Sequence, residues 1–296
     1  MTAAAPIDVD SLVAIDVHTH AEVSAVTGCG GLSPELQEAA DRYFAGAHIE
    51  RPPATEMAEY YRSRKMMAVV FTVDCTTAMG VPPVPNDEIA QAAADNPDAL
   101  IAFGSVDPHM GMAAVREVHR LVDEHGVKGF KFHPSTQAFQ PNDTAFYPIY
   151  EAIAGHGCIA LFHTGQTGIG AGLPGGGGIK LRYSNPMYLD DVAADFPGLK
   201  IILAHPSFPW QDEALSVATH KPDVYIDLSG WSPKYFPPNL IRYANTLLQD
   251  KVLFGSDFPL ITPDRWISDF EALEIKDHVR PKIMKLNAAK LLGLLP

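Results

Sequence analysis

The segment AIDVHTH, residues 14–20, is a short apolar run that ends in two histidines two positions apart. In a β-strand, side chains two positions apart share a face, so the imidazoles of His18 and His20 project together. Two imidazoles at this spacing form half of a tetrahedral zinc site, although an isolated pair is as often two hydrogen-bonded polar side chains. The rest of the chain decides between these two interpretations.

Seven further apolar runs follow, with segments of helical length between them. All eight are rich in Val, Ile, Leu and Phe and mostly continuous, as expected for parallel strands that are covered on both faces. They occupy residues 12–17, 67–73, 100–106, 127–132, 158–162, 200–204, 224–228 and 251–254. Asn185 with Pro186, and Thr262 with Pro263, have the form of a helix N-cap followed by proline. Strands alternating with helices in this way predict an α/β protein with a (β/α)8 TIM barrel, and an open doubly wound sheet is the alternative.

Two connections are longer than a simple crossover requires. Residues 21–66 follow the first strand and contain helical patterns, so we expect a small insert beside the barrel mouth. Residues 164–184 follow the fifth strand and include GIGAGLPGGGGIK. Glycine at this density predicts a mobile loop or lid rather than a packed element. We see no linker, so residues 1–296 are predicted to form one domain that contains the insert.

Composition limits the partners and the compartment. The chain of 296 residues has a formal net charge of −13, which disfavours nucleic acid or an anionic membrane as the main partner. No run reaches the ~18 apolar residues that span a bilayer, and the first residues lack the pattern of an export signal. The cysteines Cys29, Cys75 and Cys158 form no CxxC pair, so we expect reduced thiols and a cytoplasmic protein.

Metal-ligating residue types stand at the ends of four later strands. These are His133 in GFKFHP, His163 in LFHTG, His205 in IILAHP and Asp257 in LFGSD. In a closed barrel such ends meet at the mouth, and the eighth strand lies beside the first, so Asp257 approaches His18 and His20. Convergence of five strand ends favours a metal site over unrelated polar residues.

These motifs together resemble the amidohydrolase superfamily. The segments are DVHTH, GFKFHP, LFHTG, IILAHPS, LFGSDFPLITPDRW and the closing KLNAAKLLGL, and they extend over nearly the whole chain. The similarity is to the branch that contains aminocarboxymuconate semialdehyde decarboxylase, γ-resorcylate decarboxylase and many predicted metal-dependent hydrolases. It implies four metal ligands, namely His18, His20, His163 and Asp257. It also implies that His205 lies near the metal-bound water rather than on the ion.

The expected metal centre is mononuclear. Three imidazoles and one carboxylate suit Zn²⁺ best and also accept Mn²⁺, Co²⁺ or Fe²⁺. Relatives with two metals bridge them through a carboxylated lysine of the fourth strand, and Lys131 lies on that strand here. Because His133 is the residue presented at the end of the strand, a binuclear site is the lesser alternative. Lys131 is otherwise expected to pair with a carboxylate inside the barrel.

Two residues are candidates for catalysis. A divalent metal lowers the pKa of bound water to roughly 7 and polarises a substrate oxygen. Asp257 can both bind the ion and accept the proton of that water, and His205 can serve as general acid or base. A structural, hydrogen-bonded histidine is the alternative for His205.

Candidate substrate contacts rest on less specific signals. His133 either orients the substrate or supports another side chain. Arg182, together with Lys180, can contact an anionic group if the glycine-rich loop closes. Trp210 and Trp231 follow the sixth and seventh strands and offer walls for an aryl group, although packing at the rim explains them equally well. The other histidines are expected at the surface, namely His109, His119, His125, His156, His220 and His278.

Three functions are consistent with these observations. The preferred hypothesis is hydrolysis, with a metal-activated water attacking a carbonyl carbon; resemblance to hydrolases of aromatic degradation suggests an aryl β-ketoacyl thioester. The alternative is non-oxidative decarboxylation of an aromatic or unsaturated carboxylic acid. A non-enzymatic binding protein comes third, because all expected ligand positions are intact. The partner is in each case an anionic or aromatic small molecule, and the resemblance implies a homodimer.

Overall fold

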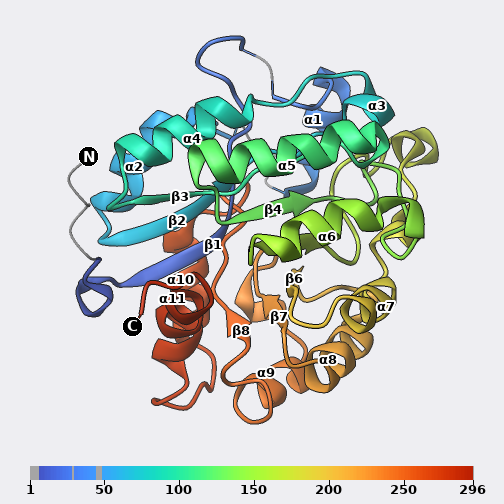
Figure 1. Cartoon of the computed structure of the whole chain (residues 1–296). Helices are drawn as coiled ribbons and strands as arrows, with labels where there is room; N and C mark the ends of the chain where they lie inside the picture. The colour runs from blue at the N-terminus through green and yellow to red at the C-terminus, as the bar shows by residue number, and fades with distance from the viewer. Residues whose placement is uncertain (1–6, 29, 45–48, 296) are drawn as a thin grey trace.

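Eight parallel strands form the centre of the computed structural model, which describes residues 7–28, 30–44 and 49–295 (Figure 1). Their bounds are β1 Ala14–His20, β2 Met66–Phe71, β3 Leu100–Ala102, β4 Gly129–Phe132, β5 Ile159–His163, β6 Lys200–Ala204, β7 Val224–Asp227 and β8 Val252–Leu253. Each strand overlaps one of the apolar runs from which it was predicted. The periodicity of the sequence therefore locates every strand of the described chain.

Backbone hydrogen bonds close these strands into a barrel. The ladders run β1-β2-β3 and β4-β5-β6-β7-β8. Beyond the end of β3, the N–H of Gly104 donates to the carbonyl of Gly129 at 2.8 Å, which joins β3 to β4. The N–H of Val17 donates to the carbonyl of Phe254 at 3.0 Å, which joins β1 to β8. The predicted TIM barrel is confirmed, and the open sheet is wrong.

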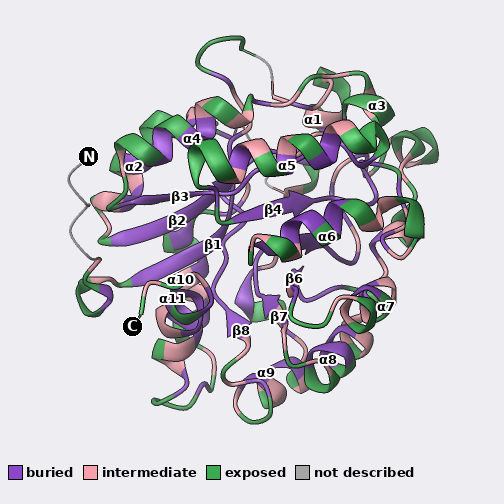
Figure 2. Cartoon of the chain, viewed as in Figure 1, coloured by how far each residue is buried: buried purple, intermediate pink, exposed green. Residues whose placement is uncertain are grey.

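Helices surround the strands and turn their buried faces toward them (Figure 2). The α-helices are α1 Pro34–Phe44, α2 Ala54–Arg62, α3 Thr76–Met79, α4 Asn86–Asp95, α5 Met112–His125, α6 Tyr147–Gly155, α7 Met187–Asp195, α8 Gln211–His220, α9 Pro238–Ala244, α10 Pro263–Glu271 and α11 Asn287–Leu291. Shorter helical turns are η1 Val9–Ser11, η2 Pro108–Met110, η3 Thr144–Phe146, η4 Pro174–Gly178, η5 Leu181–Ser184, η6 Pro233–Tyr235 and η7 Lys282–Leu286. As predicted, the Thr262 hydroxyl accepts from the backbone of Arg265 and caps α10.

The apolar core has two layers. One layer lies between strands and helices, and the other fills the barrel with alternate residues such as Ile159 and Leu161 of β5. Ala288 and Ala289 of α11 join the inner layer together with Val9, which precedes β1. The helix at the C-terminus therefore covers the end of the barrel opposite the mouth.

The insert after β1 is smaller than predicted. α2 packs its buried Met57 and Tyr61 into the layer between helices and strands, so it is the ordinary crossover helix from β1 to β2. Between β1 and α2, the described residues 21–28, 30–44 and 49–53 hold the additional structure, which includes α1. The predicted bounds of 21–66 include α2 because its helical pattern in the sequence does not reveal which layer it covers. That residues 1–296 form one domain stays a prediction.

The glycine-rich segment after β5 packs against α1, contrary to the expectation of an unpacked loop. The amide of Gln166 donates to the Tyr43 hydroxyl at 3.2 Å. A Cβ atom at Gly168 would lie 2.6 Å from the Tyr43 ring and 2.7 Å from the Phe44 ring. Glycine here permits a close approach, so the loop and α1 together form a roof over the mouth.

Candidate metal centre and active site

Three side chains at the barrel mouth form a nearly equilateral triangle of ligand atoms. The Nε2 atoms of His18 and His20 are 3.2 Å apart, and each lies 3.2 Å from Oδ1 of Asp257. Ligands about 2.1 Å from a common ion are separated by about 3.4 Å in tetrahedral and about 3.0 Å in octahedral geometry. The triangle therefore fits one divalent ion of either geometry, and it unites three of the four predicted ligands.

A register shift in β1 directs His18 and His20 into the barrel. Ile15 and Val17 belong to the inner core layer, so strict alternation would turn His18 outward. The pairing of β1 with β2 shifts between Asp16 and Thr19, and an irregularity of this kind re-aims the side chains beyond it. Alternation along the strand predicts that the two imidazoles share a face but not which face.

His205 and Asp257 enter the mouth through left-handed backbone conformations. Their φ angles are 74° and 72°, and both residues follow a strand directly or after a short extension. Ala204 is part of the inner core layer, so the left-handed turn is what keeps the next side chain at the mouth. A non-glycine residue in this region costs on the order of 1 kcal/mol, and such strain is concentrated at functional sites.

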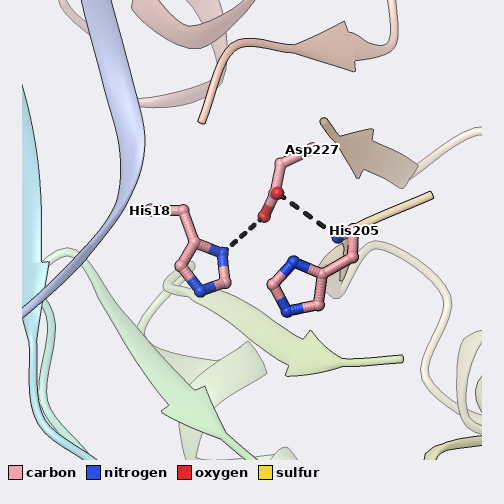
Figure 3. Close-up of side chains that lie close together, drawn as sticks. All are labelled: His18, His205 and Asp227. Carbon is pink, nitrogen blue, oxygen red and sulfur yellow. Dashed lines mark hydrogen bonds and ion pairs between the residues drawn. The ribbon is translucent and has the colours of Figure 1, made fainter. Parts of the chain in front are cut away.

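Asp227, the last residue of β7, is a functional residue that the sequence reasoning missed. Figure 3 shows its carboxylate between His18 and His205. It accepts a hydrogen bond from Nδ1 of His18 at 2.9 Å and one from the backbone N–H of His205 at 3.3 Å. The carboxylate holds His18 in the tautomer whose Nε2 lone pair faces the triangle. A weaker signal was present, because Asp227 is an acidic residue within the seventh apolar run, one position before its end.

Ser229 sets the proton positions on two further imidazoles. Its hydroxyl donates to Asp227 in a short hydrogen bond, so its hydroxyl oxygen and carbonyl accept from Nδ1 of His205, at 2.9 and 3.0 Å. Nε2 of His205 then accepts from Nδ1 of His163 at 2.9 Å. In the described ranges, Nε2 of His163 is the one buried side-chain nitrogen or oxygen without a partner. This free lone pair suits a metal ligand, although His163 lies outside the closely spaced ligand groups.

His133 presents a hydrogen-bond donor to the mouth. The backbone N–H of Thr136 donates to its Nδ1 at 3.3 Å, so the proton of the neutral ring is on Nε2. The ring stacks on that of His163, with centroids 3.8 Å apart. His133 therefore both supports a candidate ligand and offers an N–H group, which unites its two predicted roles.

Lys131 reaches the triangle rather than a carboxylate. The side chain is fully buried, and Nζ lies 3.0 Å from Nε2 of His18. Burial lowers the pKa of this amine to about 7, while Asp227 and Asp257 act in the opposite direction. An ammonium group at this distance lies beside Nε2 of His18, which is a candidate metal ligand. The positive charge of Lys131 would therefore repel a cation bound at the triangle.

The protonation states of the cluster suit a cation. Burial lowers the pKa of His18 to about 3, and the charge of Lys131 acts in the same direction. Burial also acts to raise the pKa of Asp227 and of Asp257, but charges and hydrogen bonds from neighbouring histidines hold both below the usual value. Neutral imidazoles and ionised carboxylates are the forms that bind divalent metals.

A family model described as Amidohydrolase matches residues 15–294. The chain belongs to this family. The match runs from β1 to the end of the α11 region, so it includes every residue of the triangle. The resemblance drawn from the strand-end motifs is confirmed.

Named relatives of this amidohydrolase include decarboxylases. A 2-amino-3-carboxymuconate-6-semialdehyde decarboxylase of Dictyostelium discoideum is 22% identical over 242 residues, which cover 71% of this chain and 66% of the relative, just under two thirds. An uncharacterised TIM-barrel protein of Bordetella bronchiseptica has a TM-score of 0.74 at 23% identity, covering 95% of this chain and 98% of its own. A dihydroxybenzoic acid decarboxylase of Polaromonas, solved with bound manganese and the inhibitor 2-nitroresorcinol, has a TM-score of 0.64 at 18% identity, covering 95% and 97%.

The pocket of this amidohydrolase opens above the ligand triangle. Its floor includes His20 and Asp257, and its walls come from α1, the glycine-rich loop and the segment after β7. Apolar wall residues include Leu32, Tyr43, Phe44, Ile169 and Trp231. The predicted contact His133 lines the pocket, as do His163 and His205.

Two predicted substrate contacts lie outside this lining. Arg182 is exposed, with its guanidinium 5.2 Å from the Tyr183 ring centre, because η5 carries it away from the part of the loop that enters the pocket. Trp210 is half-buried at the start of α8, and Trp231 is the tryptophan that reaches the pocket. Position in the sequence after a strand does not distinguish these two tryptophans.

Other expectations concern the rest of the molecule. Cys75 and Cys158 are free and buried, whereas Cys29 lies outside the described residues. The six histidines assigned to the surface are exposed, except that His156 is half-buried. In the described part of the chain, no helix is both long and apolar enough to cross a membrane.

Proposed function

We propose that this amidohydrolase catalyses the metal-dependent, non-oxidative decarboxylation of an aromatic or unsaturated carboxylic acid. The observation that carries this proposal is the ligand triangle of His18, His20 and Asp257 at the floor of a pocket with aromatic walls. The names of the relatives favour this reaction over the hydrolysis preferred from sequence alone. In the reaction a carbon–carbon bond breaks, carbon dioxide leaves, and a proton takes its place on carbon.

The chain's own residues divide the work between binding and proton transfer. His18, His20 and Asp257 would hold the ion, with His163 as the fourth candidate; when bound, the ion would neutralise and orient the substrate's oxygens. The Nε2–H group of His133 donates to a substrate oxygen. Asp257 or His205 takes up a proton from solvent and transfers it to the carbon that loses carbon dioxide. The aromatic walls hold the ring and limit access of water.

The test is carbon dioxide release from metal-loaded protein. We expect carbon dioxide from one or more hydroxybenzoates or unsaturated acids, with one deuterium on the product carbon in D₂O. A chelator should abolish the reaction, and His205→Asn should reduce kcat by roughly 100-fold or more with an unchanged circular dichroism spectrum. Absence of carbon dioxide from the entire panel, with protein shown to contain metal, contradicts the proposal.

Hydrolysis of a neutral carbonyl compound is the second candidate. It is favoured by one observation: among the described residues that line the pocket, Arg51 is the only arginine or lysine, and it is already bound to two carboxylates. A thioester or ester needs no cation in the outer pocket. Metal-dependent thiol or alcohol release from an aryl ester panel, without carbon dioxide release from acids, would establish this reaction instead.

The metal and the assembly are part of the proposal. We propose one zinc or manganese ion per chain, with cobalt or iron as substitutes, because the ligand triangle fits both tetrahedral and octahedral sites. Elemental analysis of purified protein measures the identity and the ratio. A homodimer and a cytoplasmic location stay predictions, and light scattering tests the first.

A further inference from the structure

Arg51 lines the outer pocket with its guanidinium fully engaged. Nε donates to Oε2 of Glu22 at 2.5 Å, and a terminal nitrogen forms a close ion pair with Asp41 on α1. The other terminal nitrogen donates to the carbonyl of Ile49 at 3.1 Å. Only 8% of the Arg51 side chain is exposed, against 18% and 23% for the two acids, so this is a built cluster rather than a surface contact.

The cluster gives the outer pocket a negative charge. Arg51 contributes one positive charge, and Glu22 and Asp41 contribute two negative ones, which leaves a net charge of −1. Among the described lining residues, no second lysine or arginine balances it. The ligand triangle, at the floor of the same pocket, is the part that a divalent cation would make attractive to an anion.

We propose that the Glu22–Arg51–Asp41 cluster makes the site selective for monocarboxylic acids and excludes a second carboxylate from the far end of the substrate. The assignment of the first carboxylate to the triangle rests on the proposed function. A second carboxylate at the far side of an aromatic ring meets one more negative than positive charge and finds no guanidinium N–H to bind. Glu22, which lines the pocket itself, is the specificity-determining residue.

Substitution of Glu22 separates charge from shape. Glu22→Gln retains an oxygen that can accept from Arg51 but removes one negative charge, so the cluster becomes neutral. One unit charge about 6 Å away in a partly hydrated pocket changes the affinity for an anion by about tenfold. Asp41→Asn makes the same change of charge from α1 and serves as the second variant. Glu38→Gln is the matched control, because Glu38 is exposed on α1 and lies outside the pocket lining.

The experiment measures dissociation constants of benzoate and of benzene-1,4-dicarboxylate on manganese-loaded protein, by competition with 2-nitroresorcinol. We expect benzoate to bind at least tenfold more tightly than the dicarboxylate. Glu22→Gln and Asp41→Asn should each reduce this ratio by about fivefold or more, mainly through tighter binding of the dicarboxylate. Glu38→Gln should leave it unchanged. Equal binding of the two acids to the unmodified protein, or a ratio that both variants leave unchanged, overturns the inference.

Failure of this inference is distinguishable from failure of the proposed reaction. If benzoate binds selectively but no acid releases carbon dioxide, the result contradicts the proposed decarboxylation and supports the proposed selectivity. If monocarboxylates and dicarboxylates release carbon dioxide with similar kcat/KM, the result supports the proposed decarboxylation and contradicts the proposed selectivity. Binding of neither acid, with metal present, overturns the selectivity as well.

Discussion

The Nδ1 atom of His18 on β1 donates a hydrogen bond to the carboxylate of Asp227 on β7, at 2.9 Å and across the intervening strand β8. The bond holds the ring so that its opposite nitrogen belongs to the ligand triangle. Asp227 also accepts from Ser229, which sets the tautomer of His205. One buried carboxylate outside the triangle thus organises imidazoles from two strands.

Asp227→Asn should weaken metal binding by about 10- to 100-fold, as expected for the partner of a metal-ligating histidine. The amide can donate to Nδ1 of His18, which favours the tautomer with a proton on the ligating Nε2. Chelator competition measures the affinity. Asp107→Asn is the control, because Asp107 is also buried but, within the described part of the chain, accepts only from backbone N–H groups of η2 and α3. Equal metal affinity in the two variants contradicts this role.

Lys131→Met should bind a single divalent ion at least about tenfold more tightly than the unmodified protein, because removal of a like charge beside the ligand atom relieves repulsion. Lys251→Met serves for comparison, since Lys251 is partly buried and donates to backbone carbonyls away from the site. Isothermal titration after chelator treatment gives both affinities. Weaker metal binding by Lys131→Met would mean that the lysine helps to hold metal, and would favour the binuclear alternative.

Gly230→Ala should lower kcat by more than tenfold. A Cβ atom at this position would lie 2.5 Å from Nδ1 of His205, and the φ angle of 73° adds backbone strain. Gly198→Ala is the control for backbone strain alone. The φ angle is 91° there, and no described atom lies within 4 Å of the added carbon. Gly198→Ala should lose about 1 kcal/mol of stability and Gly230→Ala more, and only Gly230→Ala should lose activity. Equal activities would show that the ring of His205 tolerates displacement.

Protein stripped of metal should become less stable as the pH falls from 7 to 5. Burial holds the pKa of His18 at about 3 and lowers those of His133, His163 and His205, whereas histidines of the unfolded chain take up protons near 6.5. Proton uptake therefore favours the unfolded state in this range. Burial raises the pKa of Asp16 to about 7, which acts in the opposite direction. Four imidazoles outweigh one carboxyl, so Tm should fall by roughly 5–10 °C.

Differential scanning calorimetry at several pH values between 7 and 5 tests whether the four histidines outweigh Asp16. Asp16→Asn removes the opposing contribution, so the decrease in Tm with acid should be steeper in that variant. A Tm that is constant or rises toward pH 5 would mean that the folded chain protonates these imidazoles as readily as the unfolded chain does.

Strand position and alternation predicted much of the site. His163 and Asp227 follow from simple alternation along β5 and β7, in which every second residue faces the barrel interior. The predicted set nevertheless omitted Asp227, because Leu228 follows it and continues the apolar run, so the sequence does not mark Asp227 as the end of a strand. The inward direction of His18 depends on a register shift, and that of His205 on a left-handed φ angle. Neither feature has a signature in a single sequence.

The loops were the least predictable part. Arg182 and Trp210 follow strands at plausible distances, but the paths of their segments turn them away from the pocket. Arg51 was missed for the converse reason, because it lies beyond α1 and reaches the pocket only through the fold of the insert. Hydrophobic periodicity specifies elements that cover a core, whereas loop paths depend on contacts between distant segments such as Gln166 and Tyr43.

The close approach of Gly168 to Tyr43 and Phe44 links the evolution of two distant segments. A larger residue in the loop requires smaller rings on α1, and transplanting either segment alone from another barrel brings its atoms into collision with the other. Attempts to redesign the substrate range of this protein should therefore exchange both segments as a unit.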